Sequence, residues 1–443
     1  MSQDLSVNNK KHKWLKWLIF LMFSAIVLFL SFNRHSKSGQ FNYHSEIWAD
    51  KAGYYVYLPA LFNYGFNASA FPDSIAAKTG DGFRIDTANN KVITKYSCGV
   101  AILQMPFFLA AGIFDDLSDP GRIPGFTKAH HAAINIAAVF YLLLGFLFLG
   151  RYLENRFHKP LVWLVVFVLF TATNLYYYSV DETGMSHVYS FFLFSLFLFL
   201  LQKTSYLQKA GAGILLIFGI VAGLIVLIRP TGLLFFFAAF LLEIQNVHEF
   251  KFRIKSLFQP KIMLWFIAGV VLIFLPQLLY LQYTFGSPFH YTYESEGFYW
   301  TNPQLLKTWF STNNGLFLYT PFFLIIVIAC IYAAFKRKAD GLKMLLLFVI
   351  ISYVFSSWWM WYFGCAFGAR SYVEYLAIFS IPLTFLFLKI HRSGIVAIIS
   401  FYLAVVSCIV LNFMMTYSWD GCYYGSGDWD WDAWIGTVIS KLR

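Results

Sequence analysis

Long apolar runs, separated by short polar and basic segments, make up most of the chain. Most of these runs approach the roughly 20 residues that a helix needs to cross the hydrocarbon core of a bilayer. The pattern predicts about eleven membrane-spanning helices. They are 14–32, 130–150, 161–179, 187–202, 212–228, 231–246, 262–283, 316–335, 342–359, 372–389 and 394–416.

The composition agrees with this pattern. Apolar residues make up 59% of the chain and charged residues only 12%, whereas soluble domains carry about 25% charged residues. The net charge of +11 does not indicate nucleic-acid binding, because the basic residues form short clusters between the apolar runs, as in cytoplasmic loops of membrane proteins. These clusters are Lys10, Lys11, Lys13 and Lys16; Arg151, Arg156 and Lys159; Lys203 and Lys209; Lys251, Arg253, Lys255 and Lys261; Lys336, Arg337, Lys338 and Lys343; and Lys389 and Arg392.

Residues 97–114 decide the topology. If they crossed the membrane, the basic clusters from Arg151 onward would face outward. The segment is short for a span and contains Pro106 and two glycines, so we expect a juxtamembrane or re-entrant helix. The first apolar run lacks a small-residue cleavage site and is interpreted as a retained span. The N-terminus is then cytoplasmic and the C-terminus extracytoplasmic.

The sequence thus predicts an all-α integral membrane protein with one membrane domain, residues 1–416. Its largest extracytoplasmic loop covers about 33–129 and carries juxtamembrane helices. The spacing of Tyr54, Tyr55 and Tyr57 is typical of an amphipathic helix at the lipid interface. A short tail, 417–443, alternates acid and tryptophan from Asp428 to Asp432; it is interpreted as a solvated tail anchored by tryptophan, with a carbohydrate-binding surface as the alternative.

In this topology, acidic residues collect on the outer face, so the functional site is expected there. Nucleotide donors are cytoplasmic, and the chain has neither a Walker loop nor a dinucleotide-binding glycine pattern. A lipid-carried activated donor fits better. The five cysteines form no CxxC pair and no Cys/His cluster, which argues against a structural zinc site. Cys98, Cys365 and Cys422 are candidates for an oxidising compartment, with their pairing left open.

Several stretches on this face carry a family resemblance. They are Ala49-Asp50-Lys51-Ala52-Gly53-Tyr54-Tyr55, Lys95-Tyr96-Ser97-Cys98-Gly99 before Met105-Pro106-Phe107, Asp181-Glu182, Asn314 to Pro321, and Trp358 to Tyr372. In these stretches and their order the chain resembles the GT-C superfamily of polytopic glycosyltransferases, which use polyprenyl-phosphate sugars, and is similar to protein mannosyltransferases and aminoarabinose transferases. Relatives have a proline-glycine pair where this chain has Ser97-Cys98-Gly99, which leaves the acceptor class open.

The resemblance implies that the acid of the first loop, Asp50, is catalytic. An inverting transfer needs a base that takes the proton of the acceptor hydroxyl, and a carboxylate at the membrane surface suits this role. Lys51, next to Asp50, is a candidate to keep that carboxylate ionised; the alternative is a contact to lipid headgroups. Glu46, four residues earlier, would share a helical face with Asp50. The alternative is that Asp50 is an ordinary solvated loop residue.

Asp181 and Glu182 follow a span that ends in tyrosines. One interpretation is that they orient the acceptor. Another is that, together with Asp50, they hold a divalent cation, Mg²⁺ or Mn²⁺, against the donor phosphate. A third is that they are a polar cap of the helix.

The leaving phosphate requires positive charge on the same face, and four residues are candidates: Arg370, Lys95, Arg229 and His187. Arg370 is the strongest, because a guanidinium matches a phosphate by two parallel hydrogen bonds. An ion pair between Arg370 and Glu374, one turn later, is the competing explanation. Lys95 matches a lysine that the family has before the juxtamembrane helix, and Arg229 ends a long apolar run, where a charge is costly unless it is paired.

The working hypothesis is an inverting glycosyltransferase with Asp50 as base. Its expected partners are a polyprenyl-phosphate sugar donor, the lipid bilayer, and a lipid-linked glycan, polysaccharide or protein as acceptor. We expect it in a bacterial inner membrane with an extracytoplasmic site. The alternatives are a transporter or flippase of lipid-linked sugars, and a glycan polymerase or ligase. No internal repeat of broken helices, the pattern of many secondary transporters, is visible.

Overall fold

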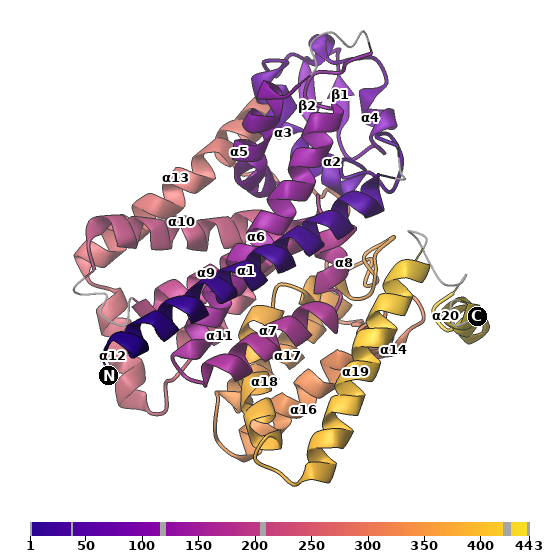
Figure 1. The fold of residues 1–443 in the computed structure, drawn as a ribbon. Helices are drawn as coiled ribbons and strands as arrows, with labels where there is room; N and C mark the ends of the chain where they lie inside the picture. The colour runs from indigo at the N-terminus through magenta and orange to yellow at the C-terminus, as the bar shows by residue number, and fades with distance from the viewer. Residues whose placement is uncertain (1, 37–38, 116–120, 204–209, 420–426, 441–443) are drawn as a thin grey trace.

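The computed structural model describes residues 2–36, 39–115, 121–203, 210–419 and 427–440. This part of the chain is mostly helical and contains one two-stranded sheet. Figure 1 shows the helices lying side by side in a bundle, with the elements of the first loop gathered at one end and α12 (Val247–Leu257) near the other. The predicted all-α architecture is confirmed in its coarser form, as a mostly helical protein with a short two-stranded sheet.

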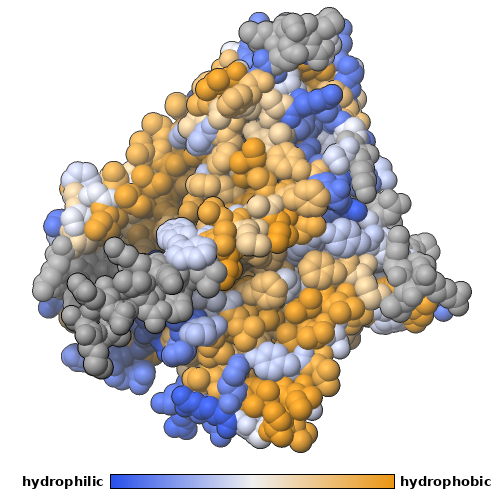
Figure 2. All heavy atoms as spheres, viewed as in Figure 1, coloured by the Kyte–Doolittle hydropathy of each residue, from blue (hydrophilic) through white to orange (hydrophobic). Residues whose placement is uncertain are grey.

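Four helices of the described residues are long and apolar enough to cross a membrane. In the helix α6 (Lys128–Glu154), 61% of the most apolar stretch is buried inside the protein; in each of the other three helices, this share is 11–17%. The α6 helix therefore lies inside the bundle, and the other three present apolar faces outward. Figure 2 shows such apolar surface over the middle of one face, with hydrophilic residues towards both ends. The four helices are α1 (Ser2–His35), α6 (Lys128–Glu154), α13 (Pro260–Phe285) and α19 (Ile395–Ser418).

Shorter apolar helices fill most of the other predicted spans. Each of the eleven predicted segments contains a helix, but the number of membrane crossings stays a prediction, because these helices are shorter than a bilayer is thick. They are α7 (Lys159–Thr171), α9 (Ser186–Lys203), α10 (Ala212–Ile228), α11 (Leu233–Leu241), α16 (Phe322–Phe335), α17 (Gly341–Ser356) and α18 (Leu376–Ile390).

Some predicted spans are interrupted, and the sequence explains where. The span predicted at 316–335 breaks before Pro321, because a residue that precedes proline avoids the helical conformation; Thr320 is accordingly non-helical. The residues 172–174, Ala-Thr-Asn, separate α7 from the next helix. The short connecting elements are α8 (Leu175–Val180), η3 (Pro230–Gly232), α14 (Leu305–Phe310), α15 (Leu316–Tyr319) and η4 (Arg370–Tyr372).

The first loop is a small folded layer. Its hairpin, in which Ile85 pairs with Val92, was not predicted, because three-residue strands leave almost no periodic pattern. Tyr54, Tyr55 and Tyr57 are buried, so the prediction that they form an interfacial helix is wrong: their rings pack inside this layer. The loop contains α2 (Asp50–Tyr55), α3 (Tyr57–Phe62), η1 (Ala68–Ala70), α4 (Ile75–Lys78), β1 (Arg84–Asp86), β2 (Lys91–Ile93) and α5 (Gly99–Ile113).

The α5 helix covers the critical segment 97–114. At fifteen residues and 1.5 Å per residue, it is about 22 Å long, shorter than the roughly 30 Å hydrocarbon core. It packs against α6 and α2. This length and packing agree with a re-entrant or juxtamembrane helix, which stays a prediction.

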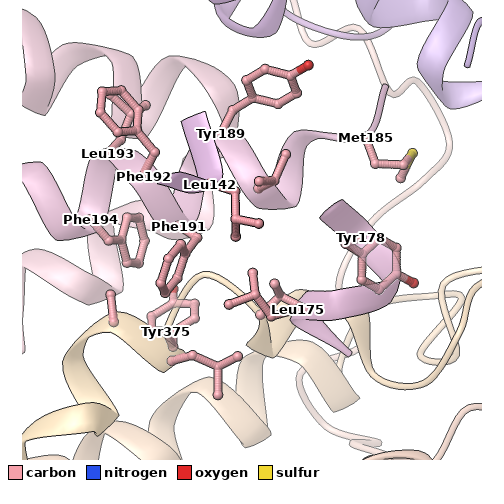
Figure 3. Packing of buried hydrophobic residues seen from close by; sticks show 14 of the residues in the cluster. Leu142, Leu175, Tyr178, Met185, Tyr189, Phe191, Phe192, Leu193, Phe194 and Tyr375 are labelled. Carbon is pink, nitrogen blue, oxygen red and sulfur yellow. The ribbon is translucent and has the colours of Figure 1, made fainter. Parts of the chain in front are cut away.

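The core is built around α9, whose aromatic side chains fill the space between α6, α8 and α18. Figure 3 shows Phe191 to Phe194 among Leu142, Leu175 and Tyr375. The rings of Phe194 and Phe235 stack with centroids 4.0 Å apart. This packing fixes α8 against α9.

Glycines bring α10 and α13 into contact. A Cβ at Gly219 would lie 2.1 Å from the Phe266 carbonyl oxygen, and a Cβ at Gly269 would lie 2.3 Å from that of Leu216. In a membrane, where helices gain no hydrophobic energy by associating, such small residues allow the close packing that holds them together.

The C-terminal tail is attached to the protein more firmly than predicted. Thr312 donates its backbone N–H to the Asp428 carbonyl at 3.1 Å, and Lys307 forms an ion pair with Asp428 at 3.0 Å. Beyond it lies α20 (Trp431–Ser440), with Trp429 and Trp431 exposed, as expected for an anchor. Residues 420–426 and 441–443 of the predicted tail, including Cys422, lie outside the described residues.

Candidate functional site

Asp50 lies at the first position of α2, where the first loop meets the bundle. Arg370 Nη2 donates to Asp50 Oδ2 at 3.0 Å, and the Tyr96 hydroxyl donates to Asp50 Oδ1 at 2.5 Å. Both carboxylate oxygens are therefore occupied. The arginine lies 320 residues away in the sequence. It is the first residue of η4, shortly before α18. The structure thus unites two residues that the sequence analysis assigned to one site.

Glycines allow Tyr96 and Asp50 to meet. A Cβ at Gly53 would lie 2.2 Å from the Tyr96 ring, and a Cβ at Gly82 would lie 1.8 Å from the Ala49 carbonyl oxygen. Distances below 3 Å are steric overlaps, so neither position accepts a side chain without movement. Gly53 was part of the quoted family stretch, and its role is to admit the tyrosine.

The environment keeps Asp50 ionised. Burial raises the pKa of its carboxyl, but the Arg370 charge, the Tyr96 hydrogen bond and the Lys95 charge together bring the pKa below its usual value. Burial and the neighbouring carboxylate raise the pKa of Tyr96 well above its usual range, so the phenol remains a donor. The Asp50 side chain is 32% exposed and that of Arg370 16%, so the carboxylate is reachable while the guanidinium is largely covered.

A cleft of about 940 Å³ opens beside Asp50. One wall is the first loop, from Ala68 to Tyr96, and the other is the segment Thr292–Glu296 that follows α13. The volume is that of a site for a small ligand rather than for a single ion. Asp50 and Lys95 both line the cleft, so a molecule bound there would contact both.

Lys95 bridges the two walls of the cleft. Its Nζ lies 2.5 Å from Glu296 Oε1. The same Nζ lies between two tyrosine rings, 5.6 Å from the ring centroid of Tyr96 and 5.5 Å from that of Tyr293. The ammonium is thus held near Asp50 while part of it stays open to the cleft.

Arg229, with His187 beside it, is a second cation nearby. Arg229 Nη1 lies 3.0 Å from His187 Nδ1 and 3.6 Å from Glu374 Oε1, and Arg229 Nη2 donates to the Ser371 hydroxyl at 3.3 Å. His187 Nδ1 also lies 3.0 Å from Glu374 Oε2. Glu374 therefore pairs with Arg229 and His187, while Arg370 pairs with Asp50. The two arginines lie together, because Ser371 directly follows Arg370.

Two expectations about the first loop need correction. Lys51 does not face Asp50: its Nζ lies 3.0 Å from Glu182 Oε2, because both residues belong to α2 and successive side chains of a helix point about 100° apart. Glu46 does not share a helical face with Asp50, since α2 begins only at Asp50. Instead Glu46 is buried and accepts from Asn135 Nδ2 at 2.5 Å.

Asp181 and Glu182 are each paired with a basic side chain. Asp181 forms an ion pair with Arg34, and Glu182 with Lys51. Burial raises the pKa of Asp181 to about 7, although Arg34 opposes this shift.

This pairing bears on the predicted metal site. Asp50, Asp181 and Glu182 each carry a cationic partner, and among the described residues no group of three or more His, Cys, Asp or Glu side chains has a metal-binding arrangement. Hard cations need several free oxygen ligands. The residues present therefore do not fit a divalent cation at this site.

Tyr96 is the residue of the candidate site that the sequence analysis missed. It was quoted as part of a family stretch but given no role, although its position next to Lys95 was a signal. Ser371, whose hydroxyl contacts Arg229, was likewise quoted only as part of the stretch from Trp358 to Tyr372 and given no role.

In this helical membrane protein a first-loop carboxylate meets an arginine of η4, shortly before α18. The expected GT-C fold is confirmed, as a fold, by similarity to solved structures. Among these are structures of the oligosaccharyltransferase of the archaeon Archaeoglobus fulgidus. No family model and no curated protein sequence matches this chain.

Three structures of that enzyme align over 94% of this chain. AglB in complex with an inhibitory peptide and a dolichol-phosphate aligns with a TM-score of 0.57 at 14% identity. The apo form aligns with a TM-score of 0.54 at 12% identity, and the form tethered to an acceptor peptide with a TM-score of 0.54 at 14% identity. The alignments cover 56–57% of the archaeal chain, so this chain spans little more than half its length.

Proposed function

We propose that the protein is a membrane glycosyltransferase that moves a sugar from a polyprenyl-phosphate donor to an acceptor hydroxyl. The observation that carries this proposal is the meeting of Asp50 with Arg370 beside a cleft that Lys95 also lines. A carboxylate that can take a proton lies next to cations that can take a phosphate, which are the two requirements of the reaction. The archaeal structure in complex with a dolichol-phosphate, itself a polyprenyl phosphate, supports the donor class.

The proposed step is a single inverting displacement. The acceptor hydroxyl gives its proton to Asp50 while its oxygen forms a bond to the anomeric carbon. The bond between that carbon and the phosphate oxygen breaks on the opposite side, and its electron pair stays on the phosphate. Arg370 and Lys95 stabilise the charge that develops there.

Arg370 has a double role in this proposal. In the free protein it neutralises Asp50 and keeps the pKa of that carboxyl low, which makes Asp50 a weak base. Its Nε is buried and has no hydrogen-bond partner among the described residues. A donor phosphate that draws the guanidinium away from Asp50 would use this donor and raise the pKa of the carboxyl. Donor binding would then activate the base.

Arg229 and His187 are proposed to extend the phosphate site. Arg229 is joined to Arg370 through Ser371, and its guanidinium is 18% exposed. Glu374 balances this charge and fixes its position. The second charge of the phosphate then has a partner without a metal ion.

We place the site on the extracytoplasmic face of the membrane, in a bacterial inner membrane. The basic clusters of the sequence support this orientation. Cys365, in the turn that precedes Arg370, is disulfide-bonded, and disulfides persist in oxidising compartments.

The proposal is tested by glycan mass spectrometry of a deletion strain that carries wild type or Asp50→Asn at matched expression. Loss of a defined sugar that only wild type restores supports transfer at Asp50 and names the sugar. Full restoration by Asp50→Asn contradicts the assignment and favours a transporter of lipid-linked sugars. Loss of long polymers without loss of a single sugar type favours a polymerase or ligase.

A further inference from the structure

The ion pair Lys51–Glu182 joins the segment that carries Asp50 to the connection between α8 and α9, and the ion pair Arg34–Asp181 joins that connection to α1. We call these two the anchor pairs. Lys51 Nζ lies 3.1 and 3.0 Å from the two carboxylate oxygens of Glu182, and the Lys51 side chain is only 3% exposed. An ammonium this well covered requires a partner, because an unpaired buried charge is costly. Glu182 supplies that partner from another part of the chain.

The backbone at this point is equally close. A Cβ at Gly184 would lie 2.2 Å from the Glu46 carbonyl oxygen and 2.9 Å from Lys51 Cβ. The connection between α8 and α9 is thus pressed against the residues just before and after Asp50. Its own turn is closed by a hydrogen bond from the Met185 N–H to the Glu182 carbonyl at 3.0 Å. The backbone that carries Glu182 is therefore held by its own hydrogen bond and by its close contact with the first loop.

A direct role of Glu182 in binding acceptor or metal does not fit this geometry. Both of its oxygens face Lys51, and neither Asp181 nor Glu182 is among the described residues that line the cleft. The Glu182 carboxylate therefore contacts Lys51 and does not line the cleft.

We propose that Glu182 is a positioning residue, which holds the Lys51 ammonium away from Asp50 and so leaves the Asp50 carboxylate to Tyr96 and Arg370. Without Glu182, two acids are left to the Lys51 ammonium: Asp181, which already pairs with Arg34, and Asp50, which adjoins Lys51 in the chain. Arg370 would then lose Asp50 as its ion-pair partner. Asp50, the proposed base, would pair with the Lys51 ammonium, which a donor phosphate does not displace. This inference rests on the proposed function.

The test compares wild type, Glu182→Gln, Lys51→Met and the double variant, each purified in lipid nanodiscs. The first readout is binding of polyprenyl phosphate, which needs no turnover. Glu182→Gln should bind it roughly 3- to 10-fold more tightly, because Lys51 replaces Arg370 at Asp50 and frees the guanidinium. The double variant, which has no free ammonium, should return to the wild-type affinity.

The second readout is the rate of sugar transfer. Glu182→Gln should lower kcat by about 10- to 100-fold, with the donor KM unchanged or lowered, since a small displacement of a reacting group has effects of this size. The double variant should recover most of the loss. Arg156→Met is the matched control, because Arg156 forms an ion pair with Glu243 at 2.7 Å away from this site; it should leave kcat per folded molecule unchanged.

Two results would overturn the inference. The first is that Glu182→Gln leaves the affinity for polyprenyl phosphate and kcat unchanged. The second is that Glu182→Gln raises the acceptor KM and the double variant does not restore it, because Glu182 would then be an acceptor contact. If wild type neither binds polyprenyl phosphate nor transfers sugar, the proposed function fails instead. In that case, melting temperatures test the Lys51–Glu182 pair on its own. The double variant should melt at a higher temperature than Glu182→Gln; an equal decrease of the melting temperature in both would refute the inference.

Discussion

Replacing Asp50 by asparagine should separate donor binding from turnover, because it removes the base and the partner of Arg370 together. Loss of a general base lowers kcat by roughly 10²- to 10⁴-fold. Donor affinity should rise, since the phosphate no longer competes with a carboxylate for the guanidinium and no longer approaches a like charge. A simple structural defect would lower both quantities.

The size of the affinity gain follows from the exposure of the pair. Exposed ion pairs contribute about 0–1 kcal/mol, and breaking a fully buried one costs about 3–5 kcal/mol. With side chains that are 32% and 16% exposed, the Asp50–Arg370 pair lies between these limits, at about 1–3 kcal/mol. At 1.4 kcal/mol for each factor of ten, polyprenyl phosphate should bind roughly 5- to 100-fold more tightly.

The assay is a titration of nanodisc-embedded protein with polyprenyl phosphate, followed by tryptophan fluorescence. Asp73→Asn is the control, because Asp73 lines the same cleft and its replacement removes the same charge without touching Arg370. Equal tightening in both variants would show a general charge effect. Unchanged or weaker binding in Asp50→Asn would refute the competition between Asp50 and the phosphate for Arg370.

Three further predictions concern pH, packing and metal. The pKa of Asp50 lies below its usual value of about 3.9, so the free enzyme keeps this base ionised. The pH profile of kcat/KM should therefore show no acidic limb from Asp50 between pH 5 and 8. The stability that the Asp50–Arg370 ion pair contributes should be lost only as the pH falls below about 4. Gly53→Ala should displace Tyr96 and lower kcat about tenfold or more, whereas Gly112→Ala, where a Cβ meets nothing within 4 Å, should have wild-type kinetics; equal rates would contradict the packing argument. Transfer should survive EDTA treatment and removal of the chelated metal, because the acids of the expected metal site are paired with basic side chains; loss of activity that Mn²⁺ or Mg²⁺ restores would contradict this.

Hydropathy predicted the positions of the helices well, since an apolar run in a membrane has few alternatives to a helix. The helix α10 has the bounds 212–228 that the sequence indicated. Breaks were harder to predict: the interruption before Pro321 depends on one local preference, and that between α7 and α8 on a few polar side chains. The β1–β2 hairpin is too short to leave a pattern.

The site was predicted in its members but not in its pairings. Asp50 and Arg370 were expected to act on the same face, from the topology and the family resemblance, yet their direct contact joins residues 320 positions apart. Lys51 and Glu182, 131 positions apart, were assigned other neighbours for the same reason. Which cation neutralises which acid depends on how helices and loops pack, and no local pattern of residues records it.

The most direct test of the account is transfer by purified protein in proteoliposomes that hold a labelled polyprenyl-phosphate sugar and the acceptor named by the deletion strain. Wild type should release one polyprenyl phosphate for each sugar transferred, with the anomeric configuration inverted, and Asp50→Asn should lose this activity while still binding polyprenyl phosphate. Movement of the intact lipid-linked sugar across the bilayer without release of polyprenyl phosphate, or a wild-type rate in Asp50→Asn, would contradict the central claim.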